Sequence, residues 1–217
     1  MVRARVPHPT PIYRIIHIDN LDVYLRRGRM HAPNHTPDDG LVYRTIHDEE
    51  VQTGRREVSI HCGPGATIHD YVPFYLGPRS PMLYRLHTGY RVSYDEGQEP
   101  LIYLVSTVQA VAASGCGFVF SDGHGLAVYT QWFDDLASLG EVDWGIVYST
   151  QWNDTPEDPD RQRRKQAEFL VHESMAWDLV EQIGVLNRAM KKTVEAVLGR
   201  HPSSGQLLVQ TKPSWYY

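Results

Sequence analysis

The sequence contains few cysteines and no long apolar run. Its two cysteines, Cys62 and Cys116, form no CxxC pair and no disulfide framework, which is typical of a reducing compartment. The most apolar span, Pro100 to Phe120, is interrupted by polar residues and glycines, so it predicts short strands and a helix, not a membrane span. Met1 to Arg14 has no apolar core of the kind that a signal peptide needs. We therefore expect a cytoplasmic protein.

The signatures of several enzyme classes are also missing. The chain has no GxxxxGK[ST] phosphate loop, no GxGxxG turn after a strand and no GxSxG nucleophile turn. Eleven histidines invite a metal site, and the tightest cluster is His61, Cys62 and His69. Its spacing matches neither HExxH nor a paired CxxC arrangement. We therefore predict no bound metal.

The charge balance is mildly acidic, with 26 Asp and Glu against 21 Lys and Arg and a formal net charge of -5. Any contact with nucleic acid therefore needs a local basic patch, because overall charge does not supply one. The basic run at 161–165 is such a patch, although a solvated loop that balances the acidic stretch 153–160 explains it equally well. The candidate DNA-binding residues are Arg161, Arg163, Arg164 and Lys165.

With 217 residues, 41% of them hydrophobic, the chain is long enough for one well-packed domain over residues 1–217. Short strands mix with helices without a regular βαβ repeat, which predicts an α+β fold. Predicted strands are Ile12–His17, Val58–Ile60, Met82–His87, Leu101–Val105, Gly117–Phe120, Gly145–Ser149, Phe169–Val171, Val185–Asn187 and Leu207–Gln210. Predicted helices are Leu21–Arg27, Tyr43–Val51, Thr107–Ala113, Thr130–Leu139, Trp177–Ile183 and Arg188–Leu198, and Met30–Gly40 is predicted to be a loop.

Polar side chains stand at the ends of several predicted strands. His17 and His124 follow strands, whereas Glu168 and the pair Arg55 and Arg56 precede them. Many enzymes hold catalytic groups at strand ends, because the sheet keeps them in register. Each residue can also have a purely structural role. His17 could be a core histidine and His124 a turn residue, Glu168 could be the last solvated acid before a strand, and the arginines could be a solvated pair. The sequence leaves both readings open.

The segment His69–Pro81 is dense in aromatic residues and prolines. Since proline restricts the backbone, we expect a fixed surface here, not a mobile loop. Its aromatic residues either pack in the core or form a wall on which nicotinamide or a nucleic-acid base stacks. These aromatic residues are Tyr71, Phe74 and Tyr75.

Three segments resemble one known family. Tyr13 to Leu21 (YRIIHIDNL), His69 to Tyr84 (HDYVPFYLGPRSPMLY) and Arg164 to Val171 (RKQAEFLV) are similar to the DarT family of DNA ADP-ribosyltransferase toxins. The similarity runs in order over about residues 11–190, and it is greatest to the branch that modifies thymidine in single-stranded DNA.

The resemblance implies an ADP-ribosyltransferase fold, in which a split, twisted central sheet with flanking helices surrounds a cleft for NAD. It implies a sequence-selective enzyme that transfers ADP-ribose from NAD to a thymine base in single-stranded DNA and releases nicotinamide. It also implies a monomeric toxin restrained by a DarG-type macrodomain antitoxin. Two alternatives remain open: the same transfer to RNA, protein or a small molecule, and an inactive nucleic-acid-binding module.

For the reaction itself, the resemblance implies that Glu168 is the catalytic glutamate. Arg56, and less directly Arg55, corresponds to the active-site arginine, and His124 to a histidine of the same cleft. A carboxylate stabilises the positive charge that develops on the ribose as nicotinamide leaves.

For NAD binding, the resemblance implies that His17 holds NAD, with Asn20 close by. The sequence departs from the family at Leu76, where a second aromatic residue usually follows Tyr75, and this puts one contact of the cleft wall in doubt. The residues expected to bind NAD are His17, Asn20, Arg56, Tyr75 and Glu168.

Overall fold

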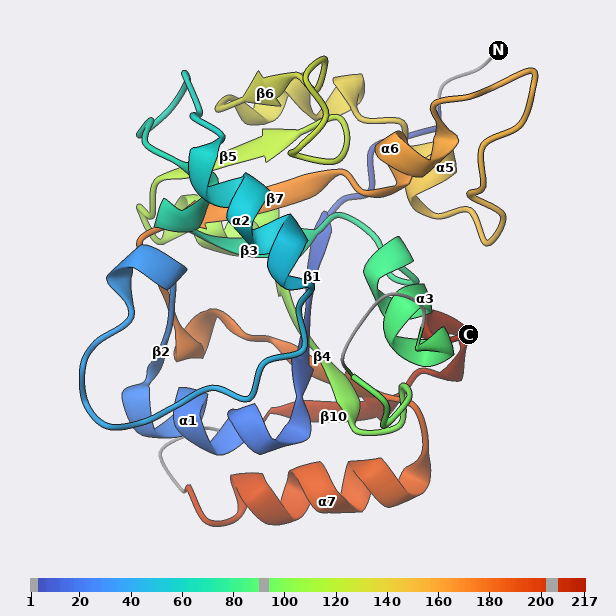
Figure 1. Cartoon of the computed structure of the whole chain (residues 1–217). Helices are drawn as coiled ribbons and strands as arrows, with labels where there is room; N and C mark the ends of the chain where they lie inside the picture. Colours follow the sequence, from blue (N-terminus) through green and yellow to red (C-terminus); the bar gives the residue numbers. More distant parts are fainter. Residues whose placement is uncertain (1–3, 90–93, 202–206) are drawn as a thin grey trace.

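The protein is described by a computed structural model that covers residues 4–89, 94–201 and 207–217 (Figure 1). Its described residues build an 8-stranded sheet in the order β10-β9-β4-β1-β3-β7-β5-β6, and β2 and β8 pair separately. Only β9 and β10 run parallel; the other paired strands are antiparallel. The strands are β1 Pro11–His17, β2 Arg29–His31, β3 Tyr71–Tyr75, β4 Leu101–Thr107, β5 Phe118–Ser121, β6 Trp132–Phe133, β7 Glu168–His172, β8 Ser174–Ala176, β9 Gln182–Val185 and β10 Leu208–Thr211.

Helices lie around this sheet. In Figure 1, α1 and α7 lie at one end of the molecule, whereas α2 lies at the opposite end, beside β3 and β7. The α-helices are α1 Leu21–Arg27, α2 Glu49–Glu57, α3 Pro81–Thr88, α4 Val108–Ala113, α5 Trp144–Val147, α6 Arg161–Lys165 and α7 Arg188–Leu198. The 3-10 helices are η1 Ile18–Asn20, η2 Pro33–His35, η3 Ile68–Asp70, η4 Leu136–Glu141, η5 Trp177–Leu179 and η7 Pro213–Trp215.

The central sheet is split between β1 and β3. β1 pairs with β4 along its whole length, from Pro11 opposite Thr107 to His17 opposite Leu101. Its pairing with β3 is confined to Tyr13 opposite Tyr75. The expected α+β fold with a split central sheet is therefore confirmed.

Pro73 explains part of this gap, because proline has no N–H to donate to a neighbouring strand. Its carbonyl instead accepts a hydrogen bond of 2.9 Å from Nη1 of Arg14 on β1. An arginine side chain thus replaces the missing strand pairing and also lines the space beside it.

The core follows the apolar pattern of the strands. Every residue of β4 is buried, as expected for a continuous apolar run in the middle of a sheet. The amphipathic helix α7 buries Val194 and Val197 on the side that faces β9 and β10. Each such side chain stabilises the fold by about 1.5–3 kcal/mol when it is fully buried.

Several predicted elements are confirmed. The strand at Ile12–His17 and the helix at Leu21–Arg27 have nearly their expected bounds, and Gly28 ends that helix with a left-handed φ of 60°. The helix at Arg188–Leu198 is confirmed residue for residue. These elements carry strong local signals, namely β-branched runs, a C-terminal glycine and a helical apolar period.

The segment Met82–His87 is not a strand but the helix α3. The side chain of Ser80 accepts a hydrogen bond from the Leu83 N–H, and Pro81 occupies the first turn. Both features are standard signals for the beginning of a helix, and they outweigh the apolar content that predicted a strand.

The helix predicted at Tyr43–Val51 begins later, because Asp48 caps α2 by accepting the Glu50 N–H. α2 therefore includes Arg55 and Arg56, and Ser59 forms only an isolated bridge in place of the predicted strand. Four other predictions are also wrong. The expected loop Met30–Gly40 contains most of β2, and the expected helix Thr130–Leu139 is replaced by β6 and η4. The expected strand Gly145–Ser149 contains most of the helix α5, and the expected helix Trp177–Ile183 is replaced by η5 and the beginning of β9.

Candidate active site

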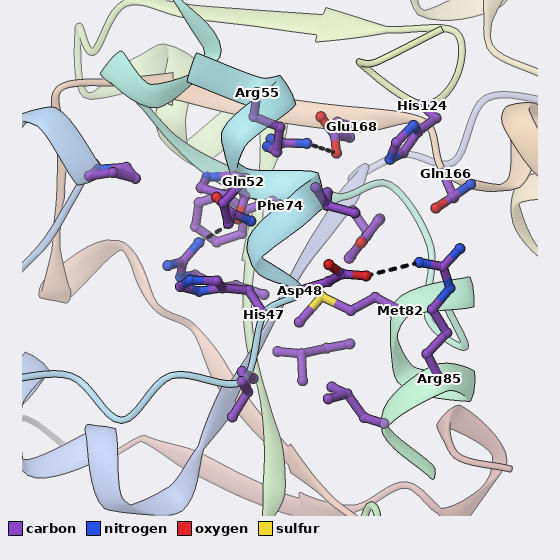
Figure 2. Close-up of a pocket in the computed structure, with 18 of the residues that line it drawn as sticks. His47, Asp48, Gln52, Arg55, Phe74, Met82, Arg85, His124, Gln166 and Glu168 are labelled. Carbon is purple, nitrogen blue, oxygen red and sulfur yellow. Dashed lines mark hydrogen bonds and ion pairs between the residues drawn. The ribbon is translucent and has the colours of Figure 1, made fainter. Parts of the chain in front are cut away.

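A cavity of about 450 Å³ lies between α2, β3, α3 and the beginning of β7, and is called the cleft below. Its volume is in the range of small-molecule binding sites. Figure 2 shows its side chains, with Arg55 and Glu168 at one end and Asp48 and Arg85 at another. No helix in the described residues is long and apolar enough to span a membrane. In the same ranges, no three His, Cys, Asp or Glu side chains gather as a metal site would require.

Glu168 is the first residue of β7 and lies opposite Tyr75 of β3. Although it begins a strand, it is only 3% exposed, which excludes the reading of a solvated acid. Its Oε1 accepts a hydrogen bond of 2.7 Å from Nη1 of Arg55. Its Oε2 is buried and has no hydrogen-bond partner in the described structure. An unsatisfied buried acceptor costs about 1–3 kcal/mol, so this oxygen is suited to a ligand.

Arg55, and not Arg56, pairs with the catalytic candidate. Arg55 lies within α2 at 6% exposure, and Coulomb attraction to Glu168 raises its pKa although burial opposes this. Arg56 is exposed, although it also lines the cleft. Successive residues of a helix point in directions about 100° apart, so α2 brings Arg55, which the resemblance placed second, to Glu168 and turns Arg56 away from it.

His124 lies in the turn after β5 and lines the cleft beside Glu168 (Figure 2). Burial lowers its pKa, and the charges of Arg55 and Arg85 lower it further, against an upward influence of Glu168. The imidazole is therefore neutral at pH 7 and has one nitrogen free to accept a hydrogen bond.

The aromatic segment is divided between the core and the cleft. Tyr71 and Phe74 are 0% and 2% exposed and lie in β3, an interior strand, so the expected surface is here a part of the core, although Phe74 also lines the cleft (Figure 2). Tyr75 lines the cleft, and burial together with the neighbouring Glu168 raises its pKa, which keeps the phenol protonated. Leu76 belongs to the hydrophobic core, so its departure from the family pattern is accommodated there and not in the cleft wall.

His17 and Asn20 are not among the residues that line the cleft. His17 is buried at the end of β1, where its Nδ1 accepts the Asp19 N–H at 3.1 Å. The Asn20 amide makes two hydrogen bonds to the backbone of Arg44, of 2.8 and 2.6 Å. Both side chains are therefore held by the protein outside the space that Glu168 faces.

The basic run forms α6, and its last residue points inward. Lys165 is 2% exposed and donates hydrogen bonds to the carbonyls of Pro78, Val147 and Ser149 at 3.0, 2.6 and 3.0 Å. Burial, and to a smaller extent the charge of Arg79, lowers its pKa to about 8. Lys165 thus joins α6 to two backbone segments, at Pro78 and at 147–149, and does not reach the surface.

The arginines of α6 also have partners inside the protein. Arg163 forms ion pairs with Asp122 and Asp160. Arg164 pairs with Asp143 and Asp158. The Nη2 atom of Arg161 donates to the carbonyl of Gln151 at 2.6 Å. The acidic residues that appeared to balance this run in the sequence are thus, in part, its direct partners.

Several cleft residues were not singled out by the sequence. His69 was considered only for metal binding, yet its buried Nε2 is unpartnered in the described structure and faces a cleft with Arg55 and Arg56. Burial, followed by these two arginines, lowers its pKa. Arg85 reaches across the mouth of the cleft to Asp48 at 3.5 Å (Figure 2). Helix caps in the sequence place these residues: Asp48 and Ser80 begin α2 and α3, and the capping box of Thr67 and Asp70 encloses His69 in η3.

Comparison with known proteins shows the family to which this chain is similar. A family model described as "ssDNA thymidine ADP-ribosyltransferase, DarT" matches residues 13–217. A DNA ADP-ribosyl transferase from Thermus sp. (strain 2.9) is 40% identical over 216 residues, which is 100% of each chain.

Solved structures agree with this match. Thermus sp. 2.9 DarT in complex with ADP-ribosylated ssDNA has a TM-score of 0.93 and 39% identity, with 100% of both chains covered. The same protein in complex with NAD+ has a TM-score of 0.88 and 39% identity, with 98% of this chain and 100% of that chain covered. The chain therefore belongs to the DarT family of single-stranded DNA thymidine ADP-ribosyltransferases.

Proposed function

We propose that this protein transfers ADP-ribose from NAD to a thymine base in single-stranded DNA and releases nicotinamide. The observation that carries the proposal is the Glu168 carboxylate, which is buried in the cleft with one oxygen bonded to Arg55 and the other unpartnered in the described structure. Membership in the DarT family supports the substrate pair, since the NAD+ and ADP-ribosylated ssDNA complexes are of a relative that matches over nearly the whole chain.

The first step breaks the bond between nicotinamide and ribose, and positive charge develops on the ribose as in glycoside cleavage. Glu168 stabilises this charge through its unpartnered Oε2, directly or through a hydrogen bond from a ribose hydroxyl. Such preorganised stabilisation in a dry site contributes roughly 10²–10³ in rate. Arg55 fixes the carboxylate by its 2.7 Å hydrogen bond and prevents it from turning away.

The second step forms a bond from a thymine ring nitrogen to the ribose, and the proton on that nitrogen leaves. We propose Glu168 as the acceptor, because its carboxylate already faces the ribose. His124, whose pKa is lowered by burial, provides a neutral hydrogen-bonding group for the base beside Glu168. The half-buried Tyr75 lies opposite Glu168 on the neighbouring strand and forms the wall of the same space.

The phosphates of the two substrates need cations at the mouth of the cleft. Arg56 and Arg85 line the cleft, and the Arg85 side chain is 39% exposed with only a 3.5 Å contact to Asp48. We propose these two arginines as phosphate contacts, because an arginine fork matches a phosphate group. Of the basic run, Arg161 is the residue that we retain for DNA binding, since its ion pair with Asp158 is long, at 4.0 Å, whereas Arg164, which is almost equally exposed, is closely paired with two carboxylates.

Binding of NAD by His17 and Asn20 is retained as a separate proposal. Nε2 of His17 is buried and makes no hydrogen bond within the described residues, and the Glu96 carboxylate lies 3.6 Å from it, so this nitrogen can still bond to a ligand. Asn20 uses one N–H and one oxygen lone pair on the backbone of Arg44, so a contact with NAD would use the second N–H or the second lone pair. His17→Ala is therefore expected to raise the KM for NAD at least tenfold, and an unchanged KM would remove His17 from the site.

We further propose that residues 1–217 act as one monomeric catalytic domain in the cytoplasm, as the toxin of a toxin–antitoxin pair. The free cysteines Cys62 and Cys116 are compatible with a reducing compartment. A DarG-type macrodomain that removes ADP-ribose from DNA is the expected antitoxin. Induction of the wild-type chain is expected to stop growth of a host that lacks an antitoxin, whereas co-expression of such a macrodomain restores growth. Unimpaired growth on induction would contradict the toxin role.

The activity is tested by incubating the protein with labelled NAD and oligonucleotides of varied sequence, followed by mass spectrometry of the products. Label on thymine in single strands is expected, with a preference for certain flanking bases, because duplex DNA conceals the base edge. Label on RNA or protein alone would assign the transfer to another acceptor. Absence of NAD turnover with intact DNA binding would leave only a binding module.

A further inference from the structure

Under the proposed function, we propose that Arg163 is a positioning residue, which fixes the turn Gly123–His124–Gly125 against Glu168 and does not contact DNA. The turn carries His124, which lies beside the catalytic candidate in the cleft (Figure 2). Arg163 lies behind it, on α6, and holds it by its backbone and by its side chain.

The guanidinium of Arg163 has no unused donor. Its Nε donates to Asp160 at 2.7 Å and its Nη2 to both Asp160 and Asp122, at 2.8 and 3.2 Å. Its Nη1 donates to Asp122 at 2.8 Å and to Thr130 at 3.3 Å. Tyr129 covers the group, with its ring centroid 4.9 Å from the guanidinium carbon. A phosphate would have to displace two carboxylates that already neutralise this charge.

These contacts surround the turn on both sides. The carbonyl of Arg163 accepts the His124 N–H at 3.0 Å. Thr130, which is bonded to the guanidinium, donates its hydroxyl to the carbonyl of His124 at 2.7 Å. Both backbone groups of His124 are therefore bonded: the N–H to Arg163 itself, and the carbonyl to Thr130, which Arg163 holds, and to the Ala127 N–H at 3.0 Å.

Two glycines allow the turn to lie this close to its neighbours. A Cβ atom added to Gly123 would lie 2.3 Å from Nη1 of Arg163, which is far inside contact distance. A Cβ atom on Gly125 would lie 3.2 Å from Oε2 of Glu168. The backbone of the turn is thus packed between the guanidinium on one side and the catalytic carboxylate on the other.

Ser121 connects the turn to the catalytic strand. Its buried hydroxyl donates to the carbonyl of Gly123 at 2.7 Å and accepts the backbone N–H of Glu168 at 3.1 Å. Glu168, Ser121 and the turn are therefore one bonded unit, and Arg163 fixes its outer side. Since a shift of about 1 Å costs roughly 10² in rate, loosening this unit reduces catalysis without removing a substrate contact.

The experiment compares Arg163→Gln, Arg163→Lys and the control Lys192→Gln. Lys192 is exposed on α7, at the end of the molecule opposite α2 (Figure 1), so its replacement removes the same charge without touching the turn. For Arg163→Gln we expect a fall in kcat of roughly 10², with the KM for the oligonucleotide unchanged within about twofold. Arg163→Lys keeps the positive charge but lacks the planar guanidinium group that bonds two carboxylates at once. It should therefore recover less than a tenth of the activity that Arg163→Gln loses.

A phosphate contact would give the opposite pattern. The KM for DNA would rise, the logarithmic salt slope of DNA binding would become shallower by about 0.7, and lysine would restore most of the activity. If Arg163→Gln kept the wild-type kcat and showed a raised KM for DNA or a shallower salt slope, the inference would be overturned. Ser121→Ala is the second variant, in case Arg163→Gln does not fold; it is expected to lower kcat without changing the salt slope.

A readout independent of activity separates this inference from the proposed function. In the ligand-free protein, the NMR signals of the His124 ring should shift and broaden in Arg163→Gln and remain unchanged in Lys192→Gln. A wild-type protein that labels no DNA would refute the proposed function, whereas unchanged His124 signals in Arg163→Gln would refute the positioning role.

Discussion

Two arginines near Glu168 meet carboxylates in opposite ways: Arg55 lines the cleft, whereas Arg163 lies behind the turn that carries His124. Arg55 shares one hydrogen bond with Glu168, and both partners retain a buried atom without a partner in the described structure, Nη2 and Oε2. Arg163 uses every nitrogen of its guanidinium on Asp122, Asp160 and Thr130. Unused polar atoms are expensive to bury, so the first pair is suited to receive a ligand, and the second is suited to hold structure.

The largest expected effect follows from Glu168→Gln, which keeps the shape of the side chain and removes its charge. Transfer should fall by about 10³ or more, while the affinity for NAD changes little, because the carboxylate acts mainly in the transition state. Single-turnover kinetics and NAD titration measure the two quantities. If the Gln variant kept wild-type turnover, the unpartnered oxygen would have no catalytic role.

A second variant pair tests whether the ion pair identifies the active-site arginine. Arg55→Gln should reduce kcat by roughly 10², because the Glu168 carboxylate loses its anchor in a water-excluded site. Arg56→Gln removes the same charge from the next residue of α2, where the side chain is exposed, and should raise KM more than it lowers kcat. The reverse ranking of the two variants would restore Arg56 to the role that the sequence assigned to it.

The buried side chain of Lys165, at the end of α6, is expected to make the stability of the protein depend on pH. The pKa of Lys165 in the folded protein is lowered from its usual 10.5 to about 8, so the unfolded chain binds more protons between these values. The free energy of unfolding therefore gains about 2 kcal/mol from Lys165 as pH rises from 8 to 10. Denaturant titrations at both pH values measure this change: between pH 8 and 10, the free energy of unfolding of the wild type should rise by about 2 kcal/mol more than that of Lys165→Met. Equal pH dependence in the two proteins would contradict the account.

The smallest expected effect concerns the acid side of the pH profile. Burial lowers the pKa of His124, so the neutral imidazole should persist below the ordinary histidine value of about 6.5. We therefore expect kcat to remain constant as pH falls from 7.5 to 6.5. A variant with a displaced turn, such as Ser121→Ala, should begin to lose activity at a higher pH. A wild-type profile that falls already at pH 7 would show that His124 is more exposed to water than its position indicates.

The sequence predicted those parts of the site that depend on short-range patterns. Glu168 at the beginning of an apolar strand and His124 just after another are visible from residue order alone. The sheet then brings them together, because β5 and β7 are antiparallel neighbours. The beginning of one strand and the end of the other therefore lie at the same edge.

The errors arise where long-range contacts decide. The choice between Arg55 and Arg56 depends on the rotation of α2, which a helix predicted several residues too early cannot give. The sequence left open whether the basic run binds DNA or balances acidic residues, and it did not reveal the partner Asp122, which lies 41 residues away from Arg163. Pro73 suggested a surface segment, although a gap in the sheet and the Arg14 side chain accommodate it in an interior strand.

The most direct test is a crystal structure of the Glu168→Gln variant with NAD bound. We expect the side chain of residue 168 to point into the cleft, within about 2.6–3.2 Å of a hydroxyl of the nicotinamide ribose. We also expect Arg55 to remain beside it. A structure with NAD bound elsewhere, and with residue 168 in contact with Arg55 alone, would contradict the central claim.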